Sequence, residues 1–399
     1  LFEKTHVAVI YGAAGTGKTY LINHVSQFMD SHSKLFLANT NPAVENLRRK
    51  VMAQNCDFMT IRKYIMSKNV PVDVDILIMD ECSMVSNADM AEVLQKVNCK
   101  ILLLVGDTYQ IESITFGNWF SMVKYFIPRY AWHELKTPYR TKDEDLLTLW
   151  EKVRELHEDL TEHIVANRYA SNLDQSVFDK KSEDEIILCL NYDGLYGINN
   201  INRFLQESNP NPAITWDIQQ YKVGDPILFL DSDRFRPIIH NNMKGIIQGV
   251  EIIDEGTTEE RIQFDIEIPK LIFERDVLNL DLKLLKNSEK EEKSLIRFYV
   301  HKLKSADEDG EDSRTVVPFQ IAYAVSIHKA QGLEYDSVKI VITDEVEELV
   351  THNIFYTAIT RAREKLRIYW TPEVEEKVIR RIKPRDISKD VEILKTYLV

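Results

Sequence analysis

The sequence predicts an α/β protein with two parallel-sheet domains and a small β module inserted into the second of them. In the first third of the 399-residue chain, continuous apolar segments alternate with helical stretches, which is typical of a parallel sheet covered on both faces. A similar alternation begins near residue 186 and resumes after residue 315. Between these parts, short segments of alternating polar and apolar residues, joined by acidic turns, predict a β-sheet or β-barrel.

These changes of pattern predict the domain boundaries. We expect a first domain over residues 1–137 and the first part of a second domain over 138–220. The inserted β module is expected over 221–314, and the rest of the second domain over 315–399. The chain starts at Leu1 and not at Met, and the first predicted strand follows almost at once, so we expect further sequence upstream.

The composition narrows the class of protein. A hydrophobic content of 44% and a charged content of 28% are ordinary for a soluble globular protein. No apolar run reaches the roughly 18 residues that span a bilayer, so we expect no membrane partner. The four cysteines lack CxxC spacing, which argues against zinc and disulfides and favours a reducing, cytoplasmic location. The net charge of −13 disfavours nucleic acid, but a basic groove can lie on an acidic body.

The first predicted strand runs into a phosphate-binding pattern. HVAVIY (residues 6–11) precedes GAAGTGKT (residues 12–19), which matches the P-loop GxxxxGK[ST] and leads into a helical stretch. Glycines let backbone N–H groups surround phosphate oxygens, and the helix N-terminus adds partial positive charge. Lys18 is expected to reach the β- and γ-phosphates, and Thr19 to bind Mg²⁺. The ATP-binding residues predicted in this loop are Gly12, Ala13, Ala14, Gly15, Thr16, Gly17, Lys18 and Thr19.

Two further predicted strands end in acidic residues. They are VDILIMDE (residues 74–81) and KILLLVGD (residues 100–107). Ligands of parallel sheets bind at the carboxyl ends of the strands, so we expect these acidic ends to converge on the P-loop. Asp80 is predicted to hold Mg²⁺, and Glu81 to act as general base for the attacking water.

Further motifs follow in the order of a known family. The segments are LANTNPAVENLRRK (37–50), TIRKYI (60–65), DECSM (80–84), GDTYQIESITFGNWF (106–120), PYRT (138–141), SIHKAQGLEYDSV (326–338) and YTAITRAREKL (356–366). With the P-loop, this series resembles the superfamily 1 helicases of the RecD-like branch, although PYRT is closer to the UvrD-like motif IV. GDPILF (224–229) with NNMKGIIQGV (241–250) resembles the start of the inserted SH3-like barrel of that branch.

The resemblance implies two RecA-like P-loop NTPase domains and assigns roles to particular residues. Gln110 would sense the γ-phosphate and the water, and Tyr139 would stack on adenine. Arg140 and Arg361 would act as arginine fingers from the second domain. The implied catalytic residues are Glu81, Gln110, Arg140 and Arg361, and the implied ATP site adds Tyr139, Gly332 and Glu334. The implied nucleic-acid contacts are Thr40, Asn41, Thr60, Arg62, Phe116, Trp119, Ser326 and His328.

The sequence departs from the family pattern in three places. The stretch IESI lacks the usual proline, and no glutamine upstream of the P-loop is available to contact adenine. Residues 65–74 are too few for the β-hairpin pin that splits a duplex in many RecD-like helicases. We therefore expect the chain to translocate but to separate duplexes poorly, unless a wedge lies in the 221–314 insert or in an absent domain.

The favoured interpretation is an ATP-dependent DNA helicase or translocase that moves 5′→3′ along single-stranded DNA. A superfamily 1 RNA helicase is one alternative, which DECSM disfavours because those relatives usually carry DEAxQ. The other alternative is an ATP-dependent nucleic-acid-binding switch, acting as a subunit of a larger defence or repair assembly. The expected cofactors are ATP and Mg²⁺, and the expected partner is single-stranded DNA, with RNA and further domains or subunits as alternatives.

Overall fold

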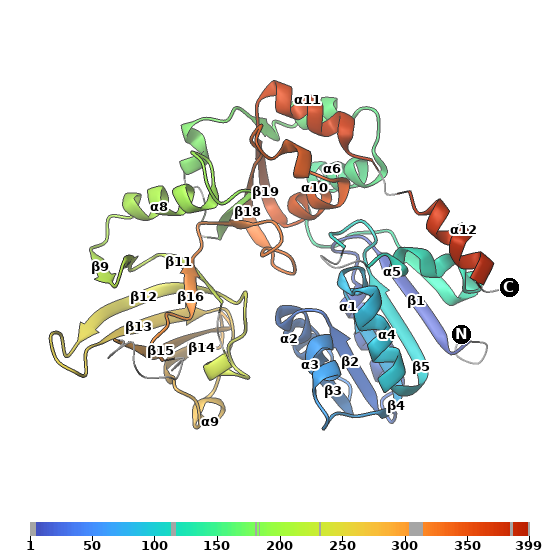
Figure 1. The fold of residues 1–399 in the computed structure, drawn as a ribbon, viewed down its shortest axis with the longest axis horizontal. Helices are drawn as coiled ribbons and strands as arrows, with labels where there is room; N and C mark the ends of the chain where they lie inside the picture. Colours follow the sequence, from blue (N-terminus) through green and yellow to red (C-terminus); the bar gives the residue numbers. More distant parts are fainter. Residues whose placement is uncertain are drawn as a thin grey trace. The chain divides into compact units, whose positions relative to one another are not determined.

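The computed structural model describes residues 5–112, 117–179, 182, 184–230, 233–302, 314–383 and 386–397 (Figure 1). The chain divides into two compact units. The first comprises residues 1–177, 181–184 and 330–399, and the second comprises residues 178–180 and 185–329.

The first unit is built on a six-stranded parallel sheet with the strand order β3-β2-β4-β5-β1-β6. The strands are β1 (Val7–Gly12), β2 (Lys34–Ala38), β3 (Cys56–Thr60), β4 (Asp73–Asp80), β5 (Asn98–Gly106) and β6 (Trp132–Leu135). The three strands predicted to converge, β4, β5 and β1, are direct neighbours. The sequence did not predict β2, β3 and β6, which are short.

Helices cover both faces of this sheet, as Figure 1 shows. They are α1 (Lys18–Phe28), α2 (Asn41–Lys50), α3 (Ile61–Met66), α4 (Asn87–Lys96) and α5 (Trp119–Met122). Along β2, Phe36 packs into a core with α1 and α2, whereas Leu35 and Leu37 pack into a second core with α3 and α4. This alternation explains why the strands are apolar throughout, because each face of the sheet is buried.

The first unit also contains a second set of parallel strands. β18 (Tyr335–Val341) pairs with β19 (Ala362–Tyr369), and β19 pairs with β7 (Ala170–Ser171). The associated helices are α6 (Glu144–Glu155), α7 (Leu160–Ala166), α10 (His352–Ile359) and α11 (Pro372–Arg381). Helix α12 (Ser388–Tyr397) lies beside the first sheet, where its Asp390 accepts a hydrogen bond from Asn118, before α5, at 2.7 Å. None of the helices in the described ranges is long and apolar enough to cross a membrane.

The second unit joins a short parallel pair to an antiparallel sheet. β8 (Glu185–Cys189) pairs in parallel with β17 (Ala324–Ser326), and α8 (Ile198–Ser208) follows β8. A hairpin of β9 (Ala213–Trp216) and β10 (Gln219–Lys222) leads into the six-stranded sheet β14-β15-β13-β12-β11-β16. Its elements are β11 (Pro226–Phe229), β12 (Lys244–Ile253), β13 (Arg261–Ile268), α9 (Glu274–Val277), β14 (Lys283–Ser288), β15 (Lys293–His301) and β16 (Phe319–Ile321).

These observations confirm an α/β fold with parallel sheets and an antiparallel β module within the later part of the chain. All neighbouring strands of the six-stranded sheet in the second unit are antiparallel. Its core is rich in aromatic side chains, with Phe264, Phe298 and Phe319 in mutual contact. Alternating burial along β15 reflects the period-2 pattern that predicted this strand.

A buried carboxylate, that of Asp225, holds in place the segment that leads into β11 of this sheet. Asp225 is fully buried, and its Oδ1 accepts hydrogen bonds from Asn209 Nδ2 and the Tyr323 hydroxyl, both at 2.8 Å. Its Oδ2 accepts from Gln206 Nε2 at 2.6 Å and from the backbone N–H of Lys222 at 3.0 Å. A buried carboxylate is tolerated when donors satisfy both of its oxygens. Asp225 therefore connects α8, the β9–β10 hairpin and the segment between β16 and β17.

Replacing this carboxylate should destabilise the fold. In Asp225→Ala the amide, phenol and backbone donors lose their common acceptor, so the free energy of unfolding should fall by roughly 2–4 kcal/mol. Urea unfolding followed by circular dichroism measures this change. Glu255→Gln, at an exposed position of the same unit, is the control and should stay within about 0.5 kcal/mol of the wild type. Equal stability of the two variants would contradict the role of Asp225.

Candidate functional site

The P-loop connects β1 to α1 and depends on its glycines. Gly15 and Gly17 have φ angles of 75° and 80°, which L side chains rarely adopt. A Cβ at Gly12 would lie 2.6 Å from Thr16 Oγ1, and a Cβ at Gly15 would lie 2.5 Å from the Cβ of Arg140. The loop therefore needs glycine for its backbone conformation and for close packing. Because α1 begins at Lys18, its N-terminal N–H groups face the space that the loop surrounds.

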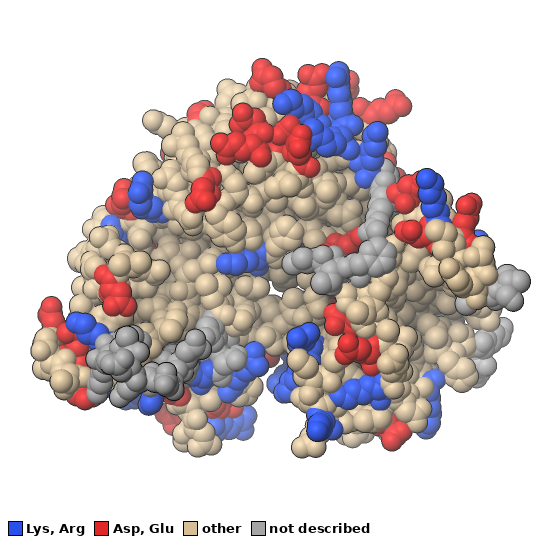
Figure 2. Space-filling view, viewed as in Figure 1, with Lys and Arg blue, Asp and Glu red and all other residues tan. Residues whose placement is uncertain are grey.

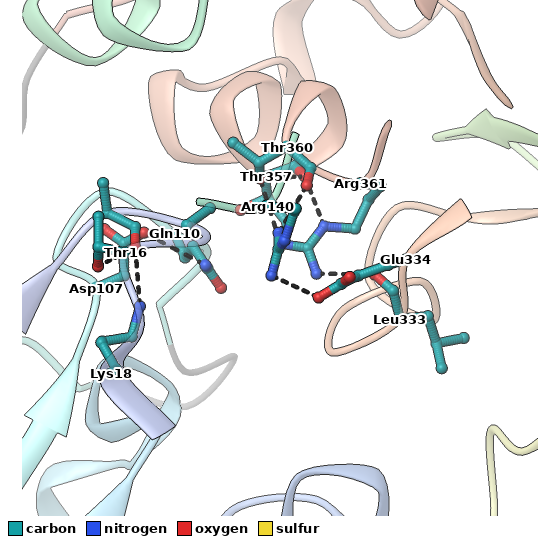
Figure 3. Close-up of polar contacts among 12 residues, drawn as sticks. Thr16, Lys18, Asp107, Gln110, Arg140, Leu333, Glu334, Thr357, Thr360 and Arg361 are labelled. Carbon is teal, nitrogen blue, oxygen red and sulfur yellow. Dashed lines mark hydrogen bonds and ion pairs between the residues drawn. The ribbon is translucent and has the colours of Figure 1, made fainter. Parts of the chain in front are cut away.

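Lys18 projects into this loop from the start of α1. Its Nζ donates to the carbonyl oxygens of Gly12 at 2.9 Å and Ala13 at 3.1 Å (Figure 3). Burial raises the pKa of the Asp80 and Asp107 carboxyls, and the nearby ammonium group of Lys18 opposes this rise. The acidic ends of β4 and β5 thus lie near the P-loop lysine, as the sequence predicts.

Asp80 and Glu81 form an acidic pair at the end of β4. Asp80 is only 5% exposed, and burial together with the Glu81 charge raises its pKa to about 7, although Lys18 opposes the shift. Glu81 has a φ of 53°, and its backbone N–H donates to Asp80 Oδ1 at 2.9 Å. Among the described residues, Oε2 of Glu81 has no hydrogen-bond partner although it is buried. A strained backbone that holds an unsatisfied carboxylate is typical of a functional site.

The segment after β5 adds Asp107 and Gln110. Asp107 is buried, and burial raises its pKa. It accepts from the backbone N–H of Tyr109 at 3.0 Å and from Gln110 Nε2 at 3.3 Å. This contact holds the Gln110 amide beside the acidic edge of the sheet (Figure 3). The strand pattern had marked Asp107 as an acidic strand end, but the predicted site did not include it.

Helix α10 supports both the P-loop and the Gln110 segment. The N–H of Ala14 donates to the Tyr356 hydroxyl at 3.2 Å, and the N–H of Ile111 donates to Thr357 Oγ1 at 3.0 Å. Asn353 Nδ2 donates to the Gln110 carbonyl at 2.7 Å. The prediction missed these three α10 residues, although Tyr356 and Thr357 belong to the YTAITRAREKL motif.

Arg140 and Glu334 form an ion pair beside this network. Arg140 Nη2 lies 2.7 Å from Glu334 Oε1, and its Nη1 donates to the Thr360 carbonyl at 2.8 Å (Figure 3). Burial acts to raise the pKa of Glu334, but the Arg140 and Arg361 cations bring it below its usual value. The pair therefore holds Arg140 by a carboxylate that stays ionised.

Arg361 differs from Arg140 in its partners. It is 2% exposed and donates to neutral oxygens: the carbonyls of Thr357 at 3.0 Å and Leu333 at 3.1 Å, and Thr360 Oγ1 at 3.2 Å. Burial and the neighbouring Arg140 lower its pKa to about 10, which still leaves it protonated near neutral pH. A buried guanidinium held by neutral groups favours an incoming anion.

The remaining residues of the predicted ATP site lie at the edges of this arrangement. Tyr139 is 75% exposed, and its backbone N–H donates to the Gly15 carbonyl at 2.7 Å. Thr19 is the second residue of α1. Gly332 has a φ of 82°, and a Cβ there would meet no atom within 4 Å, so its backbone conformation is what requires glycine.

Two of the predicted nucleic-acid contacts begin helices at the carboxyl edge of the first sheet. Thr40 caps α2 by accepting from the Ala43 N–H at 3.3 Å, and Thr60 caps α3 by accepting from the Lys63 N–H at 3.2 Å. Asn41 is the first residue of α2. Both threonine hydroxyls keep their O–H donors for another acceptor, such as a phosphate.

Basic side chains cluster on the same two helices. Figure 2 shows lysine and arginine side chains gathered over α2 and α3. The exposed basic residues of these helices are Arg48, Arg49, Lys50, Arg62 and Lys63. Only Arg62 was predicted as a contact; the run RRK at the end of α2 was the available signal for the others. This cluster provides local positive charge on a protein of net charge −13.

The other predicted nucleic-acid contacts differ from one another in burial and in the unit to which they belong. Trp119 is half-buried, and its Nε1 donates to the Val85 carbonyl at 2.8 Å. Ser326, at the end of β17, is 8% exposed, and His328 is exposed; both lie in the second unit. Phe116 falls outside the described residues.

Comparison with known families gives two matches. A model of the AAA domain matches residues 1–171, and a model of the UvrD-like helicase C-terminal domain matches residues 321–369.

Individual relatives are distant in sequence. RecBCD enzyme subunit RecD of Buchnera aphidicola subsp. Schizaphis graminum is 20% identical, over 94% of this chain and 72% of RecD. ATP-dependent DNA helicase Pif1 of Campylobacter jejuni is 23% identical, over 94% of this chain and 92% of Pif1. ATP-dependent DNA helicase PIF1 of Homo sapiens is 22% identical, over 88% of this chain and 56% of that protein.

Pif1 helicases are among the solved structures of similar fold. The crystal structure of Pif1 from Candida albicans has a TM-score of 0.59 and 16% identity, covering 99% of this chain and 97% of that one. Bacteroides Pif1 in complex with ADP-AlF3 and single-stranded DNA has a TM-score of 0.56 and 16% identity, covering 98% and 94%. These likenesses support the fold, and all the matches together confirm the resemblance to RecD-like superfamily 1 helicases.

The raised pKa of Asp80 makes stability depend on pH. Its carboxyl ionises near pH 7 in the folded chain but near pH 3.9 when unfolded, so its contribution to stability is lost as the pH rises through about 7. Asp80→Asn cannot ionise and keeps the oxygen that accepts from Glu81. Without Mg²⁺, its advantage in free energy of unfolding over the wild type should therefore grow by roughly 2 kcal/mol between pH 5.5 and pH 8. Urea unfolding at both pH values tests this; an unchanged difference would mean that Asp80 is ionised at both.

Proposed function

We propose that this RecD-like chain is an ATP-dependent DNA helicase or translocase that couples ATP hydrolysis to 5′→3′ movement along single-stranded DNA. The observation that carries the proposal is that three groups converge within one compact unit. They are the P-loop, the acidic strand ends together with Gln110, and the two arginines, Arg140 of PYRT and Arg361 just after α10. RecD and Pif1 relatives, of which the Pif1 proteins are named ATP-dependent DNA helicases, support it.

In this proposal the P-loop binds the triphosphate of ATP. Its backbone N–H groups and the N-terminus of α1 receive the phosphate oxygens. Lys18 exchanges its contacts with the Gly12 and Ala13 carbonyls for phosphate oxygens, which are stronger acceptors. Tyr139 has an exposed ring that can stack on adenine. Gly332 and Glu334 border the nucleotide on the side of Arg140.

The residues present also fit Mg²⁺. Thr19 offers a hydroxyl and Asp80 a buried carboxylate, which are oxygen ligands of the kind that Mg²⁺ prefers. Burial disfavours the ionised form of Asp80 in the free protein, so a nearby cation would favour it. The bound ion would neutralise charge that develops on the phosphates.

The hydrolytic roles follow from the surroundings of each side chain. The unsatisfied Oε2 of Glu81 can accept the proton of the attacking water. Gln110, held by Asp107, orients that water. Arg361 is buried among neutral oxygens and stabilises negative charge in the transition state, and Arg140 joins it when it leaves Glu334.

Nucleic acid would bind along the carboxyl edge of the first sheet. The hydroxyls of Thr40 and Thr60, the amide of Asn41 and the guanidinium of Arg62 suit phosphate contacts. The basic cluster on α2 and α3 adds to them. Ser326 and His328 extend the contact set in the second unit. Helix α10 hydrogen-bonds to both the P-loop and the Gln110 segment. A movement of the P-loop on nucleotide binding would therefore be transmitted through α10 to the Gln110 segment and to the rest of the YTAITRAREKL motif.

The domain scheme is part of the proposal. We infer two RecA-like domains, residues 1–137 and residues 138–220 with 315–399, and an SH3-like barrel over residues 221–314. The antiparallel order β14-β15-β13-β12-β11-β16 and its aromatic core support a small β module of that kind.

The first test is stimulation of ATP hydrolysis by nucleic acid. Single-stranded DNA should raise the ATPase rate more than RNA homopolymers do, and its binding should weaken steeply with salt because phosphate contacts release counterions. Lys18→Ala should abolish the activity, and Glu81→Gln should retain ATP binding without turnover. Equal stimulation by RNA would favour an RNA helicase. Stimulation without displacement of streptavidin from single-stranded DNA would favour the switch alternative.

A second test separates catalysis from binding at Arg361. Arg361→Ala should lower kcat by roughly 10³-fold, with a change in the Kd of ATP of no more than about tenfold, since an arginine finger acts on transition-state charge. Arg363→Ala is the matched control, because Arg363 is engaged in ion pairs with Asp184 and Asp336 at 2.7 Å and is not among the residues assigned to the nucleotide. Similar small effects of both substitutions on kcat would make Arg361 a structural residue.

A further inference from the structure

We propose that the β9–β10 hairpin, with Ile218 at its tip, is the wedge that separates the strands of a duplex. The partner is the junction between double-stranded and single-stranded nucleic acid. The inference rests on the proposed motor function and deepens it. The structure gives three reasons, which concern the tip, the residues close to it and the attachment of the hairpin.

The tip presents an apolar side chain where one is not expected. Ile218 is 96% exposed, the highest value among the large apolar side chains in the described part of the chain. It shares the two-residue connection between β9 and β10 with Asp217, whose φ is 54°. Such connections usually carry Gly, Asn, Asp or Ser, and a β-branched apolar residue there gains no burial from folding. A local departure from turn chemistry of this kind is expected at functional positions.

Residues close to the tip are fixed in a hydrophobic core. Trp216 and Tyr221, which flank the tip on the two strands, are 4% and 1% exposed. The Tyr221 ring contacts Phe264 and Phe319, with centroid separations of 5.0 and 5.7 Å. The exposed Ile218 is therefore flanked on both strands by side chains that are packed in the core.

Hydrogen bonds attach the hairpin to α8. Gln206 Nε2 donates to the Gln220 carbonyl at 2.8 Å and to Asp225 at 2.6 Å. Lys222 Nζ donates to the Asn209 carbonyl at 2.8 Å. Strand β10 and the residues that follow it are thus bonded to α8 and to Asn209, which follows the helix.

The same helix is bonded to β17, the strand that ends at Ser326 and is followed by His328. Asn202 of α8 makes two hydrogen bonds with the backbone of Ala324 in β17: its Nδ2 donates to the carbonyl at 2.9 Å, and its Oδ1 accepts from the N–H at 2.8 Å. All of these contacts lie within the second unit. A displacement of the β17 end would therefore carry the hairpin with it.

The chemistry of the tip suits bases and not phosphates. Apolar side chains such as Ile enter between base steps and unstack them, whereas the carboxylate of Asp217 would repel a phosphate. The segment in which many RecD-like helicases carry a β-hairpin pin contains no alternative wedge, because the described residues 67–72 form neither helix nor strand.

The experiment compares unwinding with translocation in the full chain. Ile218→Ala should slow unwinding of a forked duplex by roughly fivefold or more, while streptavidin displacement and DNA-stimulated ATPase activity stay within about twofold of the wild type. Ile218→Phe, which keeps an apolar wedge, should retain unwinding. Leu278→Ala is the matched control, because Leu278 is 77% exposed in the same unit. It should change none of the three activities.

The outcomes distinguish the wedge from the motor. If the wild type neither translocates nor hydrolyses ATP in response to DNA, the proposed function fails. If it translocates without unwinding, or if Ile218→Ala unwinds as fast as the wild type, the wedge alone is overturned. A photoreactive amino acid at position 218 gives an independent readout. It should crosslink to nucleotides at the fork junction, and its failure to crosslink there would also overturn the wedge.

Discussion

The buried charges at the carboxyl edge of the first sheet constrain the rest of the site. Asp80, Asp107 and Arg361 are each at most 5% exposed. Burial favours the neutral form of each side chain, so it raises the pKa of the two carboxyls and lowers the pKa of Arg361. Such groups are retained only where a charged ligand or a neighbouring charge offsets their desolvation. The charge of Lys18 offsets part of the desolvation cost of Asp80 and Asp107, and a charged ligand would have to offset the rest. In the proposed function, a bound nucleotide and its cation would offset this cost.

Helix α10 connects this strained edge to the rest of the unit. Its contacts with Ala14, Gln110 and Ile111 use backbone groups, so they depend on the position of the helix more than on the side chains of the loops. A shift of α10 would move the phosphate-binding loop and the Gln110 segment together. The following residue pair, Thr360 and Arg361, would move with it. In the proposed function, this arrangement would let one helix respond to the nucleotide and position Arg361.

The sequence predicted the parts of the fold that have strong local patterns. The apolar strands β1, β4 and β5 and the P-loop were recognised because buried strands and glycine-rich turns have few alternatives. The strands β2, β3 and β6 were missed, since they have only 5, 5 and 4 residues and β3 and β6 contain no continuous apolar run. The predicted Asp80, Glu81, Gln110 and Lys18 lie close to one another in the structure.

Other features of the site could not be derived from sequence in this way. Asn353 and Thr357 act through hydrogen bonds to the backbone of a distant segment, and no spacing rule predicts such bonds. The left-handed conformation of Glu81 also depends on tertiary context. For Ile218, the sequence shows an isoleucine beside an aspartate, but only the strand register shows that it occupies a turn.

The close approach of Gly15 to Arg140 has a consequence for how this protein can evolve. A side chain at position 15 would displace the Cβ of Arg140 and would also strain the loop backbone, so one substitution would damage the phosphate site and the arginine together. Genetic drift at either position is therefore limited by the other, although the two are far apart in the gene. A change in the PYRT segment could relieve the steric contact but not the positive φ of position 15, so a substitution of Gly15 should resist full compensation by a second mutation.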